Sequence, residues 1–282
     1  MRNSLRVTTK HISEHAALIE VEAYIKNRDL NRAPVNCNVE IKHDGKCINS
    51  QCQEISFIGD DTEKMRMTFT IEKPLLWDTE NPNLYECCLN LSEDELPADE
   101  ESTLFGIRTI SVNAIDGLLI NGKPCKLKGT CIHHDNGMLV MDEVSDVWCR
   151  HKNPYDFADY FETEVGDWIN AIVEKDYNHP SVVIYSVGNE IAEAGSKQGA
   201  YINRHLCNLF CELDDTRYTT NSLNALNCAG HRLKTIMRDV MQKFPSDGQM
   251  GGSGQGSNAL NTFMSLMYGE NGDYFAKHEL SS

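Results

Sequence analysis

The residues best placed to do chemistry are Asn189 and Glu190, an amide and a carboxylic acid that directly follow an apolar run. That run, Val182–Val187, is rich in β-branched side chains, as in a strand buried on both faces of a parallel sheet. In barrels of alternating strands and helices, catalytic groups sit at the carboxyl ends of the strands. Glu190 therefore stands where a catalytic acid would stand. The pair could instead cap the first turn of a helix, which is the commoner use of these residue types.

A helix is expected ahead of the apolar run. Asn153–Pro154 is expected to open it, and apolar residues then recur at spacings of three and four. These residues are Phe161, Val165, Trp168, Ile169, Ile172 and Val173, with Trp168 expected in the core. His179–Pro180 separates this helix from the run, because the residue before proline is pushed out of the helical region.

The segments after the run continue the alternation of strands and helices. Gly188 is expected to allow a sharp turn ahead of the Asn-Glu pair. Tyr201–Glu212 is expected to form a short amphipathic helix, and Thr216–Ser222 a strand. Such alternation indicates strands of a parallel sheet joined by helices.

The first hundred residues are expected to be all β. Apolar and polar residues alternate over Val35–Lys42, and the pattern breaks at His43–Lys46, where Asp-Gly predicts a hairpin turn. The same alternation recurs over Ile19–Ile25 and Met65–Ile71. Several short strands in this length favour an immunoglobulin-like sandwich, with another small β-sandwich as the alternative. The acidic run Ser92–Ser102 is expected to be a solvated loop.

The chain around the Asn-Glu pair resembles a known family. From Asn178 to Glu190 it reads Asn-His-Pro-Ser-Val-x-x-x-Ser-x-Gly-Asn-Glu, which closely resembles the acid/base signature of glycoside hydrolase family 2. That family comprises β-galactosidases, β-glucuronidases and β-mannosidases. The resemblance implies that Glu190 is the general acid/base, and that Asn189 hydrogen-bonds the sugar hydroxyl next to the anomeric carbon.

Other motifs extend the resemblance along the chain. Leu75–Tyr85, which holds Trp77, and Phe105–Arg108 resemble motifs of the family's sandwich domain, and Asn121–Pro124 resembles its hairpin leading into the barrel. The resemblance implies a multidomain β plus α/β fold: an immunoglobulin-like β-sandwich over residues 1–112, then an incomplete (β/α)8 TIM barrel over 113–282.

Further sugar contacts are implied at two strand ends. Lys126–Gly129 would be the first barrel strand, and His133 and His134 follow it, where the family carries a polar cluster facing the sugar. Satisfied loop histidines are an equal alternative. A zinc site is rejected, because neighbouring side chains diverge. Met138–Met141 resembles the third barrel strand, and Asp142 at its end is a candidate substrate-binding residue.

The sequence departs from the family after Asn136–Gly137. The second barrel strand, which normally ends in His-Asn-Pro, is missing, and the chain stops before the strand that carries the nucleophile. Retaining glycosidases need two carboxylates about 5 Å apart. Glu190 fits the role of the acid/base, and no residue is assigned as the nucleophile. The expected function is hydrolysis of β-linked glycosides, of β-galactosidase type. The alternatives are a catalytically silent fragment and a carbohydrate- or partner-binding sandwich.

The amino-acid composition limits the classes of binding partner that we expect. With 26 basic and 42 acidic residues the net charge is −16, which disfavours nucleic acid and anionic membranes. No apolar stretch is long enough to span a bilayer, and Met1–Lys10 has no signal-peptide core. Eleven cysteines without a Cys-x-x-Cys pair indicate reduced thiols and a cytoplasmic location. Val144–Trp148 lacks the Glu-x-His pair of magnesium-dependent relatives, so neither metal nor cofactor is expected. A carbohydrate substrate is expected, and an oligomer is possible.

Overall fold

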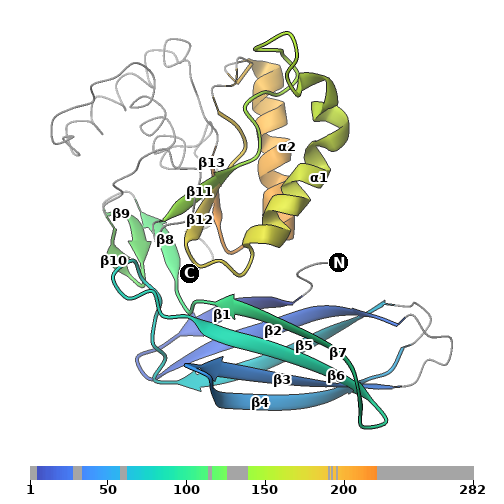
Figure 1. Cartoon of the computed structure of the whole chain (residues 1–282). Coiled ribbons are helices and arrows are strands. Elements are labelled where there is room, and N and C mark those ends of the chain that lie inside the picture. Colours follow the sequence, from blue (N-terminus) through green and yellow to red (C-terminus); the bar gives the residue numbers. More distant parts are fainter. Residues whose placement is uncertain are drawn as a thin grey trace. The chain divides into compact units, whose positions relative to one another are not determined.

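The structure, a computed structural model, describes residues 5–27, 34–57, 62–113, 116–125, 139–189, 191, 193–194 and 196–220. These residues belong to two compact units, which we treat separately (Figure 1). The first unit draws on Met1–Val112, Asp116–Leu139 and Glu174–Val182, and the second on Asn113–Ile115, Val140–Val173 and Val183–Ser282.

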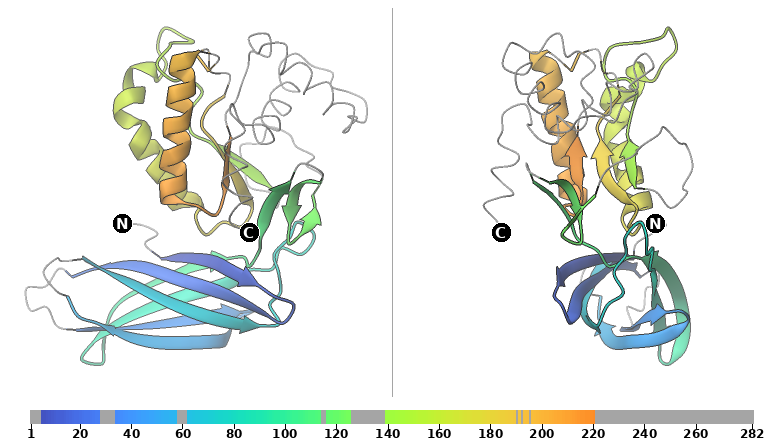
Figure 2. Two further views of the ribbon diagram at one scale, coloured as in Figure 1. Left: turned by 180° about the vertical axis from the view of Figure 1, so that it is seen from behind. Right: turned by 90° about the vertical axis from the view of Figure 1, so that its left-hand side faces the viewer.

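The first unit is a β-sandwich of two antiparallel sheets (Figure 2). One sheet has the strand order β1-β2-β5 and the other β4-β3-β6-β7, with antiparallel pairing throughout. The strands are β1 Arg6–Ile12, β2 Ala16–Lys26, β3 Val35–His43, β4 Lys46–Ile55, β5 Thr62–Glu72, β6 Tyr85–Glu93 and β7 Leu96–Phe105. The prediction of an all-β module is confirmed.

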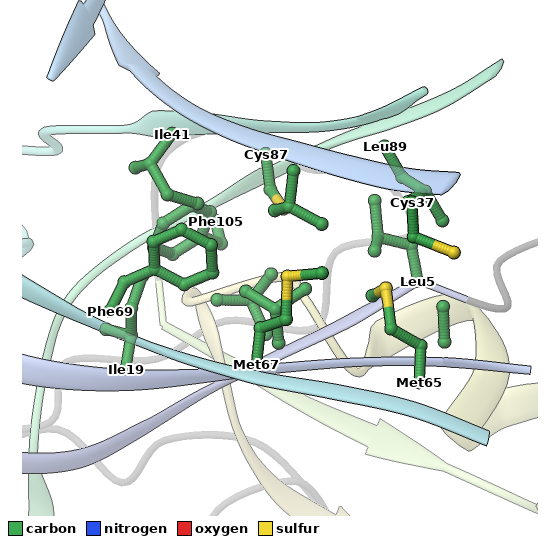
Figure 3. Close-up of a cluster of buried hydrophobic side chains, with 14 of the residues drawn as sticks. Leu5, Ile19, Cys37, Ile41, Met65, Met67, Phe69, Cys87, Leu89 and Phe105 are labelled. Atoms are coloured by element: carbon green, nitrogen blue, oxygen red, sulfur yellow. The ribbon is translucent and has the colours of Figure 1, made fainter. Parts of the chain in front are cut away.

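Period-two alternation of side chains builds the core between the sheets (Figure 3). In β5, Met65, Met67 and Phe69 are buried, while the residues between them face solvent. Each fully buried large apolar side chain contributes roughly 1.5–3 kcal/mol to folding. Cys87 is completely buried in this core, and its neighbour Cys88 points to the other face of β6 and is half-buried. Trp77 is also buried.

Two predicted hairpin turns are confirmed. Asp44 and Gly45 join β3 to β4 with φ of 49° and 72°. Asn121 and Gly122 have φ of 52° and 72°. They join two short strands of a separate three-stranded sheet, whose members are β8 Ile110–Asn113, β9 Gly117–Ile120 and β10 Lys123–Pro124. Left-handed backbone at both central positions matches the twist of antiparallel strands, and Asn, Asp and Gly tolerate it best.

The prediction of a solvated loop over Ser92–Ser102 is wrong. These residues form the end of β6, a two-residue turn at Asp94–Glu95 and most of β7. β7 is an edge strand, and its first half is exposed, so the charged side chains there stay in contact with water. Acidic side chains are compatible with an exposed edge strand, where they oppose pairing with other chains.

The two sheets are also joined by side chains along one edge. Asn49 of β4 donates from Nδ2 to the carbonyl oxygen of Thr70 at 3.0 Å, and Gln51 donates from Nε2 to that of Thr68 at 2.8 Å. Both acceptors belong to β5, the edge strand of the opposite sheet. These amides replace part of the ladder that a neighbouring strand would supply.

The second unit is built from alternating strands and helices. Its elements are β11 Val140–Glu143, α1 Ala158–Asp176, β12 Val182–Ser186, α2 Lys197–Leu213 and β13 Tyr218–Thr220, where the end of α1 and the first residue of β12 belong to the first unit. The strand order is β11-β12-β13, and β12 pairs with β13 in parallel. All five residues of β12 are buried, as the apolar run predicts. Both helices lie on one side of the sheet (Figures 1 and 2).

The expected start of α1 is wrong. The helix begins at Ala158 rather than at Asn153–Pro154. The Asp156 carboxylate accepts backbone N–H bonds from Lys152, Asn153 and Ala158, and so stabilises a turn in front of the helix. These bonds and the His151 imidazole favour the ionised form, and the pKa of Asp156 falls to about 2.

The expected burial of Trp168 is also only partly met. Trp168 is half-buried, with Phe157 and Phe161 against its edge. Ile169 and Val173 are fully buried instead, so the buried stripe runs beside Trp168 rather than through it.

α2 is longer than expected. It starts at Lys197 because the Ser196 hydroxyl caps it, accepting from the backbone N–H of Gly199 at 2.9 Å. Leu206 and Phe210 are its fully buried apolar residues.

Several predictions fall outside the described residues. These are the expected first barrel strand, the Asn136–Gly137 junction, His133, His134 and Glu190. Among the helices that the structure describes, none is long and apolar enough to cross a membrane.

Candidate active site

The candidate site lies where β12 ends. Backbone bonds fix the path of the chain after Ser186: Val187 N–H donates to Thr220 of β13 at 2.9 Å, and Asn189 N–H donates to Ser145 at 3.0 Å. On the β11 side, Val144 N–H donates to the Ser186 carbonyl oxygen at 3.0 Å. The turn is therefore held from both neighbouring strands.

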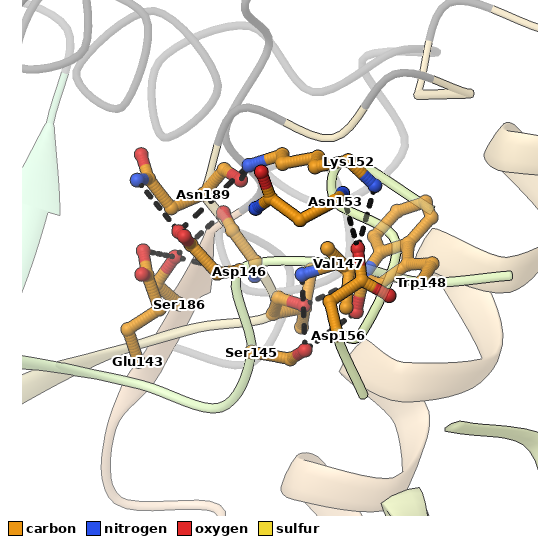
Figure 4. Close-up of polar contacts among 12 residues, drawn as sticks. Glu143, Ser145, Asp146, Val147, Trp148, Lys152, Asn153, Asp156, Ser186 and Asn189 are labelled. Carbon is orange, nitrogen blue, oxygen red and sulfur yellow. Dashed lines mark hydrogen bonds and ion pairs between the residues drawn. The ribbon is translucent and has the colours of Figure 1, made fainter. Parts of the chain in front are cut away.

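The Asn189 side chain is oriented by two charged residues of the segment after β11 (Figure 4). Its Nδ2 donates to Asp146 Oδ1 at 2.9 Å, and its backbone carbonyl oxygen accepts from Lys152 Nζ at 2.8 Å. Lys152 Nζ also lies 3.8 Å from the Asp146 carboxylate. Asp146 and Lys152 thus brace the residue that immediately precedes Glu190 in sequence.

A buried tryptophan supports the same turn from below. Trp148 is 1% exposed, and its indole Nε1–H donates to the Val187 carbonyl oxygen at 2.9 Å. A Cβ atom on Gly188 would lie 2.9 Å from that nitrogen and 2.8 Å from Cγ1 of Ile191. Gly188 does not adopt a positive φ. Its role is close packing, rather than the conformational freedom expected from the sequence.

A carboxyl group from β11 meets a hydroxyl from β12 at the same place. Glu143 Oε2 lies 3.2 Å from Ser186 Oγ. Burial of the carboxyl group raises the pKa of Glu143 to about 7; the charges of Asp146 and Asp142 act in the same direction, while the Ser186 bond and Lys152 oppose them. Glu143 can therefore hold a proton near neutral pH.

A second carboxyl group is buried just beyond the site. Glu193 is 4% exposed, and its Oε1 accepts from the Arg150 backbone N–H at 3.1 Å. Its Oε2 has no hydrogen-bond partner among the described residues. The Glu193 carbonyl oxygen packs where a Cβ on Gly199 would be, which fixes the chain at the start of α2.

The segment that leads into β12 is held by the β-sandwich of the first unit. Asn178 accepts from Val7 N–H at 2.9 Å and donates to Leu5 O at 2.7 Å. Arg108 donates to the carbonyl oxygens of Pro180 and Val182 at 2.6 and 2.9 Å. The Asn-His-Pro and Phe-Gly-x-Arg motifs therefore meet within one unit.

Gly106 explains the glycine of the second motif. A Cβ there would lie 2.8 Å from the Pro180 ring and 2.8 Å from Trp77. Close packing, rather than a turn, requires glycine at this position.

The structure describes two of the five predicted site residues. Asn189 is half-buried at the end of β12, and Asp142 is half-buried in β11, where its Oδ1 accepts from Glu143 N–H at 2.9 Å. Glu190, His133 and His134 lie outside the described residues.

Sequence reasoning missed the supporting residues. These are Glu143, Asp146, Trp148, Lys152 and Ser186. Only Ser186 carried a signal, since it is a fixed position of the signature. No cluster of metal-ligating side chains occurs in the described part of the chain.

Two family models match this chain, one over the β-sandwich and one over the segment with alternating strands and helices. The family model described as Glycosyl hydrolases family 2 matches residues 3–108, and that of the family's TIM barrel domain matches residues 135–250. Together they match well over half of the chain. The β-sandwich and the strand-helix alternation with its polar strand ends are thus those of a glycosidase family, and the chain belongs to glycosyl hydrolases family 2.

The relatives are longer than this chain. Beta-galactosidase BoGH2A of Bacteroides ovatus is 25% identical over 316 residues, which cover 83% of this chain and 37% of the relative. A beta-galactosidase of Vibrio cholerae is 31% identical over 178 residues, or 45% of this chain and 17% of its own length. The chain thus spans little more than a third, or less, of these relatives.

A solved structure agrees with the fold. A glycosyl hydrolase family 2 member from Bacteroides cellulosilyticus superposes with a TM-score of 0.79 at 25% identity, over 87% of this chain and 39% of that one.

Proposed function

We propose that this chain is part of a retaining glycoside hydrolase that cleaves the O-glycosidic bonds of β-linked sugars, with Glu190 as the acid/base. The observation that carries the proposal is the bracing of Asn189 at the end of β12 by Asp146 and Lys152. A side chain used only to cap a helix would need no such support, whereas a group that must meet one sugar hydroxyl needs a fixed orientation.

The chemistry assigned to Glu190 is proton transfer. Its carboxyl group protonates the leaving oxygen and later takes a proton from the attacking water, while a second carboxylate attacks the anomeric carbon. An acid in this role keeps its proton near neutral pH when burial or a neighbouring carboxyl group raises its pKa. Glu143, which ends β11 and lies 3.2 Å from Ser186 Oγ, adds such a carboxyl group to the strand ends.

For the substrate we propose a β-galactoside, since relatives in Bacteroides and Vibrio are beta-galactosidases. A β-glucuronide is the alternative, since a putative beta-glucuronidase of Formosa agariphila is 25% identical over 239 residues. Asn189, Asp142, His133 and His134 are the proposed sugar-binding residues.

For the domains we propose an immunoglobulin-like sandwich over residues 1–112 and a partial TIM barrel over 113–282. The strand order β1-β2-β5 against β4-β3-β6-β7 supports the first. For the second, we propose that the second strand-helix unit is skipped after Asn136–Gly137. The alignment with the Bacteroides ovatus enzyme supports this skip, because it runs over 316 positions but covers only 83% of the 282 residues of this chain, so the enzyme has insertions relative to it.

We also propose a reducing, cytoplasmic location. The nine cysteines in the described part of the chain are all free thiols. Burial raises the pKa of Cys37 to about 11 and that of Cys87 to about 12, which keeps both thiols unreactive.

The test is hydrolysis of two β-galactosides that differ only in the leaving group. A methyl galactoside needs a proton on its leaving oxygen, whereas a dinitrophenyl galactoside does not. In Glu190→Gln we expect hydrolysis of the methyl compound to fall by about 10²–10⁴-fold, and that of the dinitrophenyl compound to fall far less. Glu164→Gln, on the exposed face of α1, is the matched control and should leave both rates unchanged.

Equal losses on both substrates would rule out the acid/base role. Absence of turnover in the unmodified chain, on galactosides and glucuronides alike, would support the alternative of a catalytically silent piece. That alternative is favoured by the small share of its relatives that the chain spans.

A further inference from the structure

The hydroxyl group of Ser186 contacts three polar groups at once. Its Oγ lies 3.2 Å from Glu143 Oε2, 3.2 Å from the Gly188 carbonyl oxygen and 3.4 Å from the Gly188 backbone nitrogen. Ser186 ends β12, Glu143 ends β11, and Gly188 belongs to the turn that carries Asn189. One hydroxyl thus links a carboxyl group to the backbone of the turn.

The protons of this cluster can be counted. A serine hydroxyl offers one hydrogen to donate and two lone pairs to accept with. The Gly188 carbonyl oxygen can only accept, so it takes the Ser186 hydrogen, and the Gly188 N–H can only donate, so it uses one lone pair. In this arrangement the remaining lone pair is left for Glu143, and a protonated Glu143 carboxyl group donates its hydrogen to it. With an ionised Glu143 the Ser186 hydroxyl must be the donor of this 3.2 Å bond instead.

Loss of that proton rearranges the cluster. An ionised Glu143 has no hydrogen to give, so the Ser186 hydroxyl turns to donate to the carboxylate. The Gly188 carbonyl oxygen then loses its partner.

We propose that Glu143 is a positioning residue whose protonated carboxyl group, acting through the Ser186 hydroxyl, holds the Gly188–Asn189 turn in place. The proposal deepens the proposed function, on which it rests for its catalytic meaning, because Glu190 follows directly on Asn189. Glu143 itself need not touch the sugar.

The electrostatic surroundings of Glu143 agree with this role. Burial of the carboxyl group and the negative charges of Asp146 and Asp142 raise the pKa of Glu143 to about 7, against the opposing charge of Lys152 and the Ser186 contact. Among the described residues, these are the charged groups that act on it. The residue as a whole is exposed, and only the end of its carboxyl group that meets Ser186 is partly buried, so it exchanges protons freely with the surrounding water. Below about pH 7 the Ser186 hydroxyl bonds the Gly188 carbonyl oxygen, and above it this one bond is lost while the backbone bonds of Val187 and Asn189 remain.

Trp148 provides a readout that does not require catalysis. Its indole Nε1–H donates to Val187 O at 2.9 Å, and the indole lies directly against Gly188. The NMR resonance of this N–H reports the geometry of the turn. The chain has three tryptophans, so Trp148→Phe assigns the resonance. Trp77 is a buried residue of the first unit, between β5 and β6, and its resonance reports whether each variant is folded.

The experiment is a pH titration of the indole N–H resonances of the full chain. We expect the Trp148 resonance to shift with a midpoint of about 7. Glu143→Gln should abolish the shift and keep the low-pH position, because the amide donates to Ser186 at every pH. Ser186→Ala should also abolish it, and Glu164→Gln should leave it unchanged. The rival acid is Glu190, the proposed acid/base, so Glu190→Gln is included, and its Trp148 resonance should still titrate.

The outcomes separate this proposal from the proposed function. A Trp148 titration that survives Glu143→Gln, or that is absent from the unmodified chain, overturns the role of Glu143. If the titration disappears in Glu190→Gln instead, the role of Glu143 fails while that of Glu190 gains support. Where turnover is measurable, Glu143→Gln should also weaken the fall in kcat on the alkaline side. Failure of turnover overturns only the enzymatic proposal and leaves the titration result standing.

Discussion

The side-chain amide of Asn178 hydrogen-bonds the backbone N–H of Val7 at 2.9 Å, at the start of the sandwich. With its second bond, to Leu5 O, the amide supplies the acceptor and donor that a neighbouring strand would otherwise present. Asn178 is the first residue of the signature that ends in Glu190. In this chain the first part of that signature has a structural role, and the part to which we assign chemistry follows the far end of β12.

Loss of the Asn178 amide should destabilise the chain. Asn178→Ala leaves Val7 N–H and Leu5 O without their partner, and we expect a loss of about 1–3 kcal/mol. Asn178→Asp keeps the acceptor for Val7 and should lose less. Urea unfolding, followed by tryptophan fluorescence, measures both. Gln53→Ala on the exposed face of β4 is the control, and an equal loss there would contradict the assignment.

A methyl group at Gly188 should disturb the turn. Gly188→Ala places Cβ 2.8 Å from Ile191 and 2.9 Å from Trp148 Nε1, and we expect a loss of about 1–3 kcal/mol through overpacking. Gly166→Ala, in α1 with no atom within 4 Å of the new Cβ, should instead stabilise the chain by about 0.5–1 kcal/mol. Thermal unfolding of the pair measures the contrast. Opposite signs are the expected result, and equal effects would argue against close packing at Gly188.

The buried pair of Asp214 and Arg217 should govern stability in acid. Both side chains are almost fully buried, with Nη1 and Oδ2 2.5 Å apart, and the Tyr185 hydroxyl also donates to Oδ2 at 3.1 Å. Burial alone would raise the pKa of Asp214, but the Arg217 charge and the hydrogen bonds from Thr216 outweigh it, so the pKa is lowered.

The sign of the pH effect follows from that direction. The folded pKa lies below the unfolded value of about 3.9, so the stabilisation is present above that value and is lost as pH falls through the folded pKa. Asp214→Asn leaves Arg217 buried without its counter-charge, and we expect a loss of about 3–5 kcal/mol at neutral pH. The variant should also show a flatter dependence of stability on pH in acid. An unchanged acid profile in urea unfolding would refute the role of the pair.

Release of Asn189 should reduce catalysis. Asp146→Ala removes the acceptor of the Asn189 amide, and a displacement of about 1 Å at a group that orients the substrate can cost up to about 100-fold in rate. We expect kcat/KM on an aryl β-galactoside to fall, with little change in unfolding free energy, since Asp146 is largely exposed. Asp167→Asn, on the exposed face of α1, is the control. A fall in stability as large as the fall in rate would indicate a structural role only.

The sequence was most informative where local rules decide. The alternation in β5, the Asp44–Gly45 and Asn121–Gly122 turns and the buried run of β12 follow from side-chain periodicity and from backbone preferences of single residues. The acidic composition of Ser92–Ser102 led to the wrong prediction of a loop. The exposed half of the edge strand β7 has no alternating apolar residues that would indicate a strand.

The site was less predictable than the fold. Asn189 could be located from the signature, since its place follows from the strand that precedes it. The residues that hold Asn189, Asp146 and Lys152, could not be located from the sequence. They contact Asn189 only because β11 pairs with β12, and neither strand alone determines the register of that pairing. The contact between Glu143 and Ser186 depends on the same register.

The amides of Asn49 and Gln51 have a consequence for the behaviour of many copies of the chain in solution. An extended segment from another molecule that docked along β5 would need the carbonyl oxygens of Thr68 and Thr70, and both are occupied. Each such bond is worth about 1 kcal/mol net, so displacing both makes strand addition unfavourable at this edge. The sandwich therefore resists polymerisation through β5 by these two side-chain bonds, in addition to the charged residues Glu63, Lys64 and Arg66 on the strand itself.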